Sequence, residues 1–346
     1  MLPHRDRSGS HSAGIDSGAG MGGELDGNAR RFQVPWYKGN IHCHSTNSDG
    51  DLSPREVAAL YRSGGYDFIC ITDHNRVTDP SEADLEDDNF LVIPGIEFTY
   101  DGVESSYIHV NAIGYAIDDK LPDSPRTLVE GMRQIVEVIN KSGAFSVLDH
   151  PNWRWGYGVE EIACVPNAHA FEVYNGASAC NNHGDSEHAS TDRLWDSLLS
   201  RGVRLLGIAS DDAHDYSVVN PTYAEPPFTG WICVRAENLK KQAIMESLLR
   251  GDFYASNHPV ITSMSSSREC VEIQIQEIDQ IKYTTTFVGK HGRILKRVSG
   301  EKALYLPNGN EGYVRAVVSD TDGHKAWTQP VFLDRQDVRS DASATD

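Results

Sequence analysis

Residues 39–50 read GNIHCHSTNSDG, which places two histidines one residue apart and a carboxylate five residues after the second. On an extended strand alternate side chains point to the same side, so His42 and His44 can face one point in space while Cys43 faces the other way. Converging neutral imidazoles suit zinc, iron or manganese. A His-x-His pair also occurs as a plain polar pair at a sheet edge, and the rest of the chain decides between these interpretations.

The flanking sequence predicts an α/β fold. From Trp36 onward, short apolar runs alternate with helical patterns, which indicates a parallel sheet or barrel with helices outside. Ser53 and Glu56 form a capping box, with a proline at the first helical position, and so begin the first helix. The expected strands cover residues 37–44, 68–72, 90–93, 108–114, 144–148, 170–174 and 203–209.

Metal-competent side chains follow the carboxyl ends of several of these strands. His74 comes directly after FICITD, His150 after AFSVLD, and His214 shortly after the strand that ends in SDD. In α/β sheets and barrels the loops at this edge face one shared crevice, where sites assemble. A single histidine there is usually structural, but five or six at equivalent ends of successive strands favour a metal centre.

The pattern changes after the helix expected near residues 239–250. Between residues 260 and 334, alternating apolar positions and turn signals such as Asn308-Gly309-Asn310 predict a small antiparallel β-sandwich-like domain. No cluster of metal ligands is evident there. We expect a disordered leader over 1–31, a metal-binding barrel over 32–258, the β domain over 259–334 and a flexible tail over 335–346. The β domain is also a candidate surface for oligomerisation or a cover for the site.

Composition narrows the class of partner. The net charge of −19 opposes tight binding to long nucleic acid but allows a small phosphorylated substrate. The six cysteines form no Cys-x-x-Cys pair, which fits a reducing cytoplasm better than a zinc ribbon or a disulfide framework. There is no apolar run long enough for a transmembrane helix, and the leader lacks the apolar core of a secretory signal. We therefore expect a cytoplasmic protein with no membrane partner.

A series of motifs, taken in chain order, resembles the PHP (polymerase and histidinol phosphatase) superfamily of metal-dependent phosphoesterases. They are His42-x-His44, Asp49, Thr72-Asp73-His74, Gly95-Ile96-Glu97, His109-Val110-Asn111, Asp149-His150-Pro151-Asn152 and Asp212-Ala213-His214. The match runs from residue 39 to residue 258, about two-thirds of the chain. The resemblance implies a distorted (β/α)7 barrel, which agrees with the expected strands.

The resemblance also implies two to three divalent ions, either zinc, manganese or iron. It assigns His42, His44 and Asp212 to the first ion, Glu97 as a bridge to a second ion held by His109 and His150, and Asp49, His74 and His214 to the third. A metal-bridging hydroxide held by Glu97 and Asp212 is the implied nucleophile.

Two further carboxylates are expected behind the ligands. Asp211 is an alternative to Asp212, but Asp-x-His spacing places Asp212 on the same face as His214, so we favour Asp212. Asp73 is expected either to orient His74 or another ligand, or to cap a turn.

The implied activity is hydrolysis of a small phosphomonoester or phosphodiester, such as a nucleotide, a sugar phosphate or an amino-alcohol phosphate. Arg154 and Arg76 are candidates for gripping a phosphate, and Asn152 and Asn175 for hydrogen bonding to substrate, with surface and turn roles as the alternatives. Two other functions remain open. A nuclease or proofreading domain is disfavoured by the acidic charge, and a non-catalytic metal-binding module is disfavoured by the full ligand set.

Overall fold

A computed structural model describes residues 34–84, 87–117, 125–217 and 224–333. The predicted leader and tail lie outside these residues. The described residues all fall within one compact unit that begins at Val34. The boundary expected at residues 258 and 259 therefore stays a prediction.

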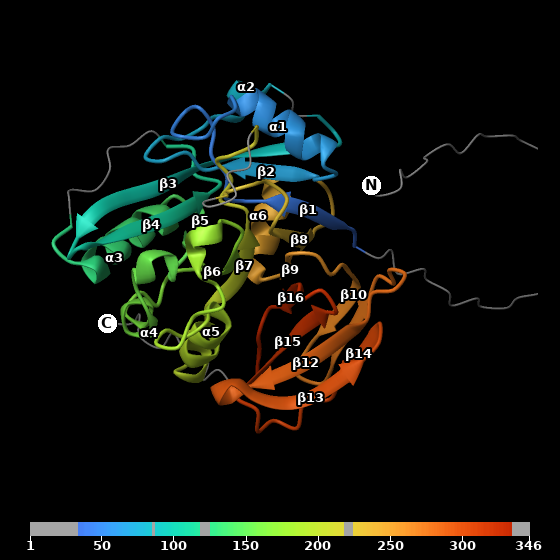
Figure 1. The fold of residues 1–346 in the computed structure, drawn as a ribbon. Helices are drawn as coiled ribbons and strands as arrows, with labels where there is room; N and C mark the ends of the chain where they lie inside the picture. Colours follow the sequence, from blue (N-terminus) through green and yellow to red (C-terminus); the bar gives the residue numbers. More distant parts are fainter. Residues whose placement is uncertain (1–33, 85–86, 118–124, 218–223, 334–346) are drawn as a thin grey trace, which may run out of the picture. The chain divides into compact units, whose positions relative to one another are not determined.

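Seven strands lie side by side in chain order and form most of a distorted barrel (Figure 1). They are β1 (Trp36–Asn40), β2 (Phe68–Ile71), β3 (Leu91–Val103), β4 (Ser106–Ile113), β5 (Phe145–Leu148), β6 (Ala170–Asn175) and β7 (Leu206–Ser210). Next to β1 come β8 (Trp231–Arg235) and then β9 (Phe253–Ser256). Because β7 in turn lies against β8 and β9, the sheet curves back on itself. The predicted α/β barrel is confirmed.

The barrel departs from a purely parallel sheet at β3. This strand is 13 residues long and turns directly into β4, so β3–β4 and β4–β5 are antiparallel, whereas β1–β2, β2–β3, β5–β6 and β6–β7 are parallel. We expected the third strand to end at residue 93, with Glu97 beyond it. Glu97 instead lies within β3, because pairing with β4 continues the strand past Pro94 and Gly95.

Helices pack on the outside of the barrel through one apolar face each. The longer ones are α1 (Pro54–Ser63), α3 (Leu128–Lys141), α5 (Thr191–Ser200) and α6 (Lys241–Arg250); α2 (Pro80–Ala83) and α4 (Val159–Ala163) are short. In α3 the buried Met132, Ile135, Val136 and Ile139 recur at helical spacing. The predicted capping box of α1 is present, with Ser53 and Glu56 each accepting from the other's backbone N–H.

The first strand is shorter than predicted. β1 ends at Asn40, and beyond it Cys43 makes only an isolated bridge to Ala213. The alternation of side chains nevertheless persists. The Cys43 thiol is fully buried in the wall of the barrel, 3.6 Å from the carbonyl oxygen of Cys70, as expected for a residue that faces away from the two histidines.

The C-terminal part consists of antiparallel strands, as predicted. One sheet contains β10 (Ile261–Ser266), β11 (Val271–Ile275) and β14 (Lys302–Tyr305). The other strands are β12 (Tyr283–Gly289), β13 (Arg293–Ser299), β15 (Tyr313–Asp320), β16 (Lys325–Thr328) and β17 (Val331–Phe332). Apolar side chains from both groups share one core, for example Ile273 and Phe287. Since β16 pairs with β9, this region continues the barrel sheet (Figure 1).

A buried ion pair also joins the two parts. The Nε and Nη2 atoms of Arg315 in β15 each lie 2.8 Å from an oxygen of Asp196 in α5. The Arg315 side chain is only 1% exposed, so this bidentate pair is shielded from water.

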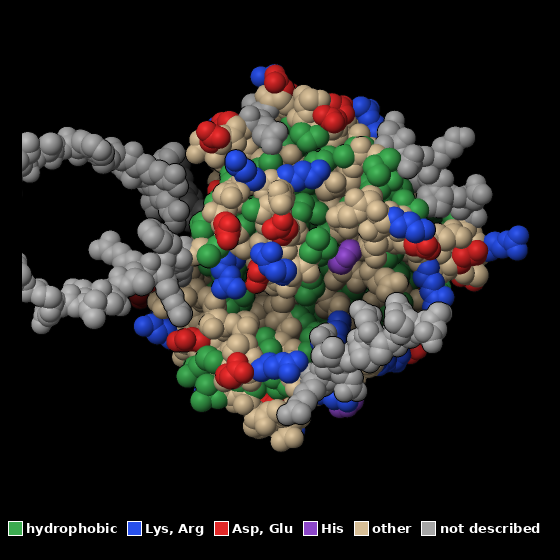
Figure 2. All heavy atoms as spheres, turned by 180° about the vertical axis from the view of Figure 1, so that it is seen from behind, with side chains coloured by type: hydrophobic (Ala, Val, Ile, Leu, Met, Phe, Trp, Pro, Cys, Tyr) green, Lys and Arg blue, Asp and Glu red, His purple; other side chains and the backbone are tan. Residues whose placement is uncertain are grey.

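The described helices are all too short or too polar to cross a membrane. On the face shown in Figure 2, Lys and Arg side chains are interspersed with Asp and Glu rather than gathered in a basic stripe.

Candidate metal centre

Four side chains converge where β1, β3 and β7 open toward one end of the barrel. His42 Nε2 lies 3.3 Å from Glu97 Oε2 and 3.1 Å from Asp212 Oδ1. His44 Nε2 lies 3.2 Å from each of the same two oxygens. Ligand atoms of one tetrahedral ion lie roughly 3.3 Å apart, because the bonds to nitrogen and oxygen are about 2.0–2.2 Å. The four atoms therefore have the spacing of ligands around a single ion.

The second oxygen of Glu97 faces a different pair of histidines. His109 Nδ1 lies 2.7 Å from Glu97 Oε1, and His150 Nε2 lies 3.7 Å from the same oxygen. His150 Nε2 is also 3.8 Å from Asp212 Oδ2. Glu97 and Asp212 thus each offer one oxygen to either side, which is the arrangement of two bridging carboxylates.

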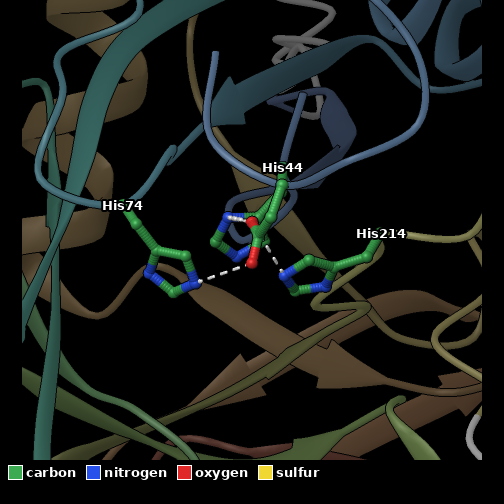
Figure 3. A group of neighbouring side chains, drawn as sticks. His44, His74 and His214 are labelled. Atoms are coloured by element: carbon green, nitrogen blue, oxygen red, sulfur yellow. Dashed lines mark ion pairs between the residues drawn. The ribbon is translucent and has the colours of Figure 1, made fainter. Parts of the chain in front are cut away.

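A third group lies at the more exposed side of the cluster. His214 Nε2 is 3.4 Å from Asp49 Oδ1, and His74 Nε2 is 3.6 Å from Asp49 Oδ2. Figure 3 shows His44, His74 and His214 turned toward one another around a carboxylate. The Asp49 side chain is 57% exposed, so a third ion here would be the one most open to water. The structure therefore brings together every residue that the sequence proposed as a ligand.

Two of these residues have an unusual backbone. The φ angles of His150 and Asp212 are 23° and 52°, in the left-handed region that non-glycine residues rarely adopt. Such conformations cost on the order of 1–3 kcal/mol and persist only where the surrounding structure holds them. Both residues come shortly after a barrel strand. Their left-handed backbone directs the two side chains into the cluster.

Glu172 orients the first ligand, and the sequence did not single it out. His42 Nδ1–H donates to Glu172 Oε1 over 2.7 Å, which leaves Nε2 free to face Glu97 and Asp212. The other oxygen of Glu172 accepts from the His150 N–H over 2.7 Å and from Asn175 Nδ2 over 2.8 Å. A carboxylate that fixes the tautomer of a ligating histidine is typical of metal sites. The one available signal was a glutamate within the buried run AFEVY.

A similar support exists for His214. Its Nδ1 lies 2.9 Å from the carbonyl oxygen of Asp212 and 3.1 Å from Glu225 Oε2, so Nδ1 carries the proton and Nε2 faces Asp49. Glu225 was also missed, because it lies in a loop with no strand or motif to mark it.

Asp211 points away from the cluster. Its carboxylate accepts from the backbone N–H groups of Phe228, Thr229 and Gly230 and from the Tyr61 hydroxyl. Of the two adjacent carboxylates, Asp212 is thus the one that faces the histidines. Asp73 accepts from the Ser45 N–H over 2.7 Å, which fits the turn-capping alternative. It also accepts from Ser48 Oγ over 2.7 Å, and that hydroxyl lies 3.4 Å from Nδ1 of His44, so the alternative that Asp73 orients another ligand stays open.

The charges and unpaired atoms of the cluster fit divalent ions. Within the part of the chain that the structure describes, the ion-pair partners of Glu97 are all histidines. Burial alone raises the pKa of Glu97, but His109, His74 and His42 hold it well below its usual value. Glu97 Oε1 and His109 Nδ1 lie 2.7 Å apart but are not aligned for a hydrogen bond, and His109 Nε2 and His150 Nδ1 are likewise buried without one among the described residues. A buried carboxylate ringed by such nitrogens is a donor set suited to a divalent cation, which would compensate its charge.

The cluster forms the floor of a cleft of about 890 Å³. Its walls include Tyr107, Trp153 and Arg154. The guanidinium carbon of Arg154 lies 4.3 Å from the centre of the Trp153 ring. A cleft of this size accommodates a small organic phosphate.

The other three residues proposed for substrate binding lie elsewhere. Arg76 Nη2 forms an exposed ion pair with Glu82 at 2.8 Å and is not among the residues that line the cleft. Asn152 Nδ2 donates to the backbone oxygens of Asn181 and Ala189. Asn175 Nδ2 donates to Glu172 and, over 3.1 Å, to Asp212 Oδ2, so it supports the ligands from behind.

Comparison with known proteins finds distant similarities. No family model matches the chain. A 5'-3' exoribonuclease of Haemophilus influenzae is 28% identical over 102 residues, a match that spans 29% of this chain and only 36% of that relative.

Two solved structures resemble the chain over a larger share. A two-domain protein from Bacteroides vulgatus, described as containing a predicted PHP-like metal-dependent phosphoesterase, is 20% identical, covers 86% of this chain and 95% of its own, and has a TM-score of 0.46. A candidate metal-dependent phosphoesterase from Bifidobacterium adolescentis is 16% identical, covers 62% and 96%, and has a TM-score of 0.43.

The distorted barrel and the grouping of the proposed ligands at one end of it agree with the fold and the site that the motif resemblance implied.

Proposed function

We propose that this protein is a metal-dependent phosphoesterase that hydrolyses a small phosphomonoester or phosphodiester. The observation that carries the proposal is the position of Glu97. Its two carboxylate oxygens face separate groups of histidines, His42 and His44 on one side and His109 and His150 on the other. Two ions bridged by one carboxylate form the arrangement used for in-line displacement at phosphorus.

Bound divalent ions would lower the pKa of a water molecule at the site and would polarise the phosphoryl oxygens. The protein's part is to hold the ligands and to shape the cleft. Glu172 keeps His42 in the tautomer whose Nε2 faces the cluster. Asn175 donates to Asp212 Oδ2 and so fixes the second bridging carboxylate. Burial of Glu97 and Asp212 excludes bulk water from their side of the site and strengthens each electrostatic interaction there.

An arginine on the wall of the cleft is the reason to propose a phosphorylated substrate. Arg154 is exposed on that wall, where its guanidinium can form paired hydrogen bonds with a phosphate oxygen pair. Nitrogen and carboxylate donors together favour zinc, manganese or iron over magnesium alone. A nucleotide, a sugar phosphate and an amino-alcohol phosphate all remain candidate substrates.

A nuclease that acts on short oligonucleotides is the second candidate, and the partial match to an exoribonuclease is the observation that favours it. The net charge of −19 weighs against an extended nucleic-acid track, which needs several Lys or Arg to neutralise phosphates. The two candidates differ in substrate and share the ligand cluster.

The decisive experiment compares substrates and a bridging-ligand variant. We expect the metal-loaded protein to hydrolyse an aryl phosphate and a subset of phosphorylated metabolites, and Glu97→Gln to reduce the rate to background with an unchanged circular dichroism spectrum. Full activity in that variant would refute the bridging role. Turnover restricted to oligonucleotides in the same screen would replace the first candidate by the nuclease.

A further inference from the structure

A second group of metal-competent side chains lies outside the cleft, where the barrel meets the C-terminal strands. His258 follows β9, Asp320 is the last residue of β15, and His324 immediately precedes β16. The Nδ1 atoms of the two histidines each lie 3.1 Å from Asp320 Oδ2. Their rings are 4.7 Å apart between centroids. Three ligand atoms therefore converge on one point. Two of them, from Asp320 and His324, belong to the C-terminal strands, where no cluster was evident from the sequence because His258 joins them only in the folded chain.

The carboxylate is held in place before any ligand arrives. Asp320 Oδ1 accepts from the backbone N–H groups of Asp322 and His324, each over 2.9 Å. These bonds close the β15–β16 turn and leave Oδ2 for the two histidines. The Asp320 side chain is fully buried, whereas each histidine side chain is 41% exposed. An ion bound here would have two imidazoles and one carboxylate from the protein and would remain reachable by water.

The histidine from the barrel is also positioned by its backbone. The His258 N–H donates to Ser256 Oγ over 3.1 Å. Asn257 exchanges two hydrogen bonds with Lys325: its N–H donates to the Lys325 carbonyl over 3.0 Å, and its Oδ1 accepts from the Lys325 N–H over 2.6 Å. Pairing of β9 with β16 thus sets the separation of His258 and His324 (Figure 1).

We propose that His258, Asp320 and His324 form a separate binding site for a divalent transition-metal ion of the zinc class. The two distances of 3.1 Å agree with ligand atoms that share one ion, which are roughly 3.3 Å apart when bond lengths are about 2.0–2.2 Å. Two imidazole nitrogens and one carboxylate oxygen are a donor set that zinc and its neighbours prefer to calcium or magnesium. None of the three residues belongs to the cluster in the cleft.

An ion at this position would tie the last strand of the barrel to the β15–β16 turn. Its ligands come from both sides of the β9–β16 pairing, so metal binding would stabilise the joined sheet. The site goes beyond the proposed hydrolase function, since it does not face the cleft and its loss need not alter the chemistry there.

Histidine-to-asparagine substitutions distinguish a metal site from a clasp, meaning three side chains that are held together by hydrogen bonds alone. In His258→Asn and His324→Asn, the amide nitrogen can replace Nδ1 as a donor to Asp320, but it cannot replace imidazole as a zinc ligand. His291→Asn is the matched control, because His291 is exposed in the same region and its φ of 66° suits asparagine. Each full-length protein is loaded with Zn²⁺, desalted and assayed for zinc per chain by elemental analysis.

We expect each test variant to hold one zinc equivalent fewer than the wild-type protein, while His291→Asn keeps the wild-type value. We also expect added Zn²⁺ to raise the unfolding temperature of the test variants less than that of the control. An unchanged zinc content in a folded test variant would overturn the proposal, even if its unfolding temperature fell, because the triad would then be a clasp that needs no metal. The result is independent of the proposed phosphoesterase activity, which this assay does not use.

Discussion

Asp211 and Asp212 are adjacent in the chain but face opposite environments. Asp212 Oδ1 lies 3.1 Å from His42 Nε2, whereas Asp211 Oδ1 accepts from the Gly230 N–H over 2.7 Å. The φ of 52° at Asp212 is what turns the second side chain toward the histidines. His42 and His44 hold the pKa of Asp212 well below its usual value against the effect of burial, while burial raises the pKa of Asp211.

Replacing each aspartate with asparagine should therefore affect a different property of the protein. Asp212→Asn should lose most of the bound metal and the activity while it stays folded. Asp211→Asn should keep its metal but lose about 1–3 kcal/mol of unfolding free energy, because a buried N–H loses its acceptor. Metal analysis and denaturant unfolding of both variants check this. If only Asp211→Asn lost metal, Asp211 rather than Asp212 would be the ligand.

Glu172→Gln should weaken metal binding although Glu172 is not itself a proposed ligand. The carboxylate accepts from His42 on one oxygen and from His150 N–H and Asn175 on the other. An amide can satisfy only one side, since its nitrogen is a donor. Loss of such an orienting partner typically costs 10–100-fold in metal affinity or activity, a range we expect here. Competition with a chromogenic chelator measures it, and an unchanged dissociation constant would contradict the role of Glu172.

Metal binding should release a proton from His214. Burial lowers the pKa of this imidazole, but Asp49, Asp212 and Glu225 together raise it to about 10 in the metal-free protein. In an unfolded chain the pKa is about 6.5. The protonated imidazole thus stabilises the metal-free fold fully below about pH 6.5, and this contribution is lost as the pH rises through about 10.

An ion on Nε2 must displace that proton, so its affinity should increase with pH up to about 10. Calorimetric titrations with Zn²⁺ in buffers of different ionisation enthalpy count the protons released. We expect His214→Gln to release about one proton fewer than wild type near pH 8. Equal release by both proteins would show that His214 is neutral before the metal arrives.

The ligands could be read from the sequence because each follows, or lies in, a strand of the same sheet. His74, His150 and His214 needed only the rule that carboxyl ends of successive strands meet. Glu97 was identified by its motif, but its position inside a long β3 was not, because the antiparallel β3–β4 hairpin depends on pairing that no local pattern shows.

The supporting residues could not be read in this way. Glu172 acts through contacts with His42 and Asn175 that arise only after the barrel closes. Arg154 and Arg76 looked alike, since both follow a proposed ligand by a few residues; their different surroundings come from loop conformation. His258 and Asp320 are 62 residues apart in sequence, and only the β9–β16 pairing brings them together.

Arg315→Ala should destabilise the fold without touching the cleft. The buried guanidinium neutralises Asp196 and also lies 3.3 Å from Asp192. Removing one partner of a buried ion pair typically costs about 3–5 kcal/mol, because the other charge is left uncompensated. Arg297→Ala in exposed β13 is the control, with an expected change within about 0.5 kcal/mol. Urea unfolding compares them, and similar midpoints would contradict a stabilising role for Arg315.

The two arginines proposed for substrate binding offer a matched pair. Arg154 lines the cleft, where a bound phosphate would gain a charge-assisted hydrogen bond worth about 1.5–3 kcal/mol. Arg154→Ala should therefore lower kcat/KM for a phosphorylated substrate by roughly 10–150-fold, with metal content unchanged. Arg76→Ala should have little effect, since Arg76 is paired with Glu82 outside the cleft. Steady-state kinetics on one substrate decide between them: equal losses would mean that both loops reach the phosphate, and a loss confined to Arg76→Ala would place the phosphate beside Arg76 rather than Arg154.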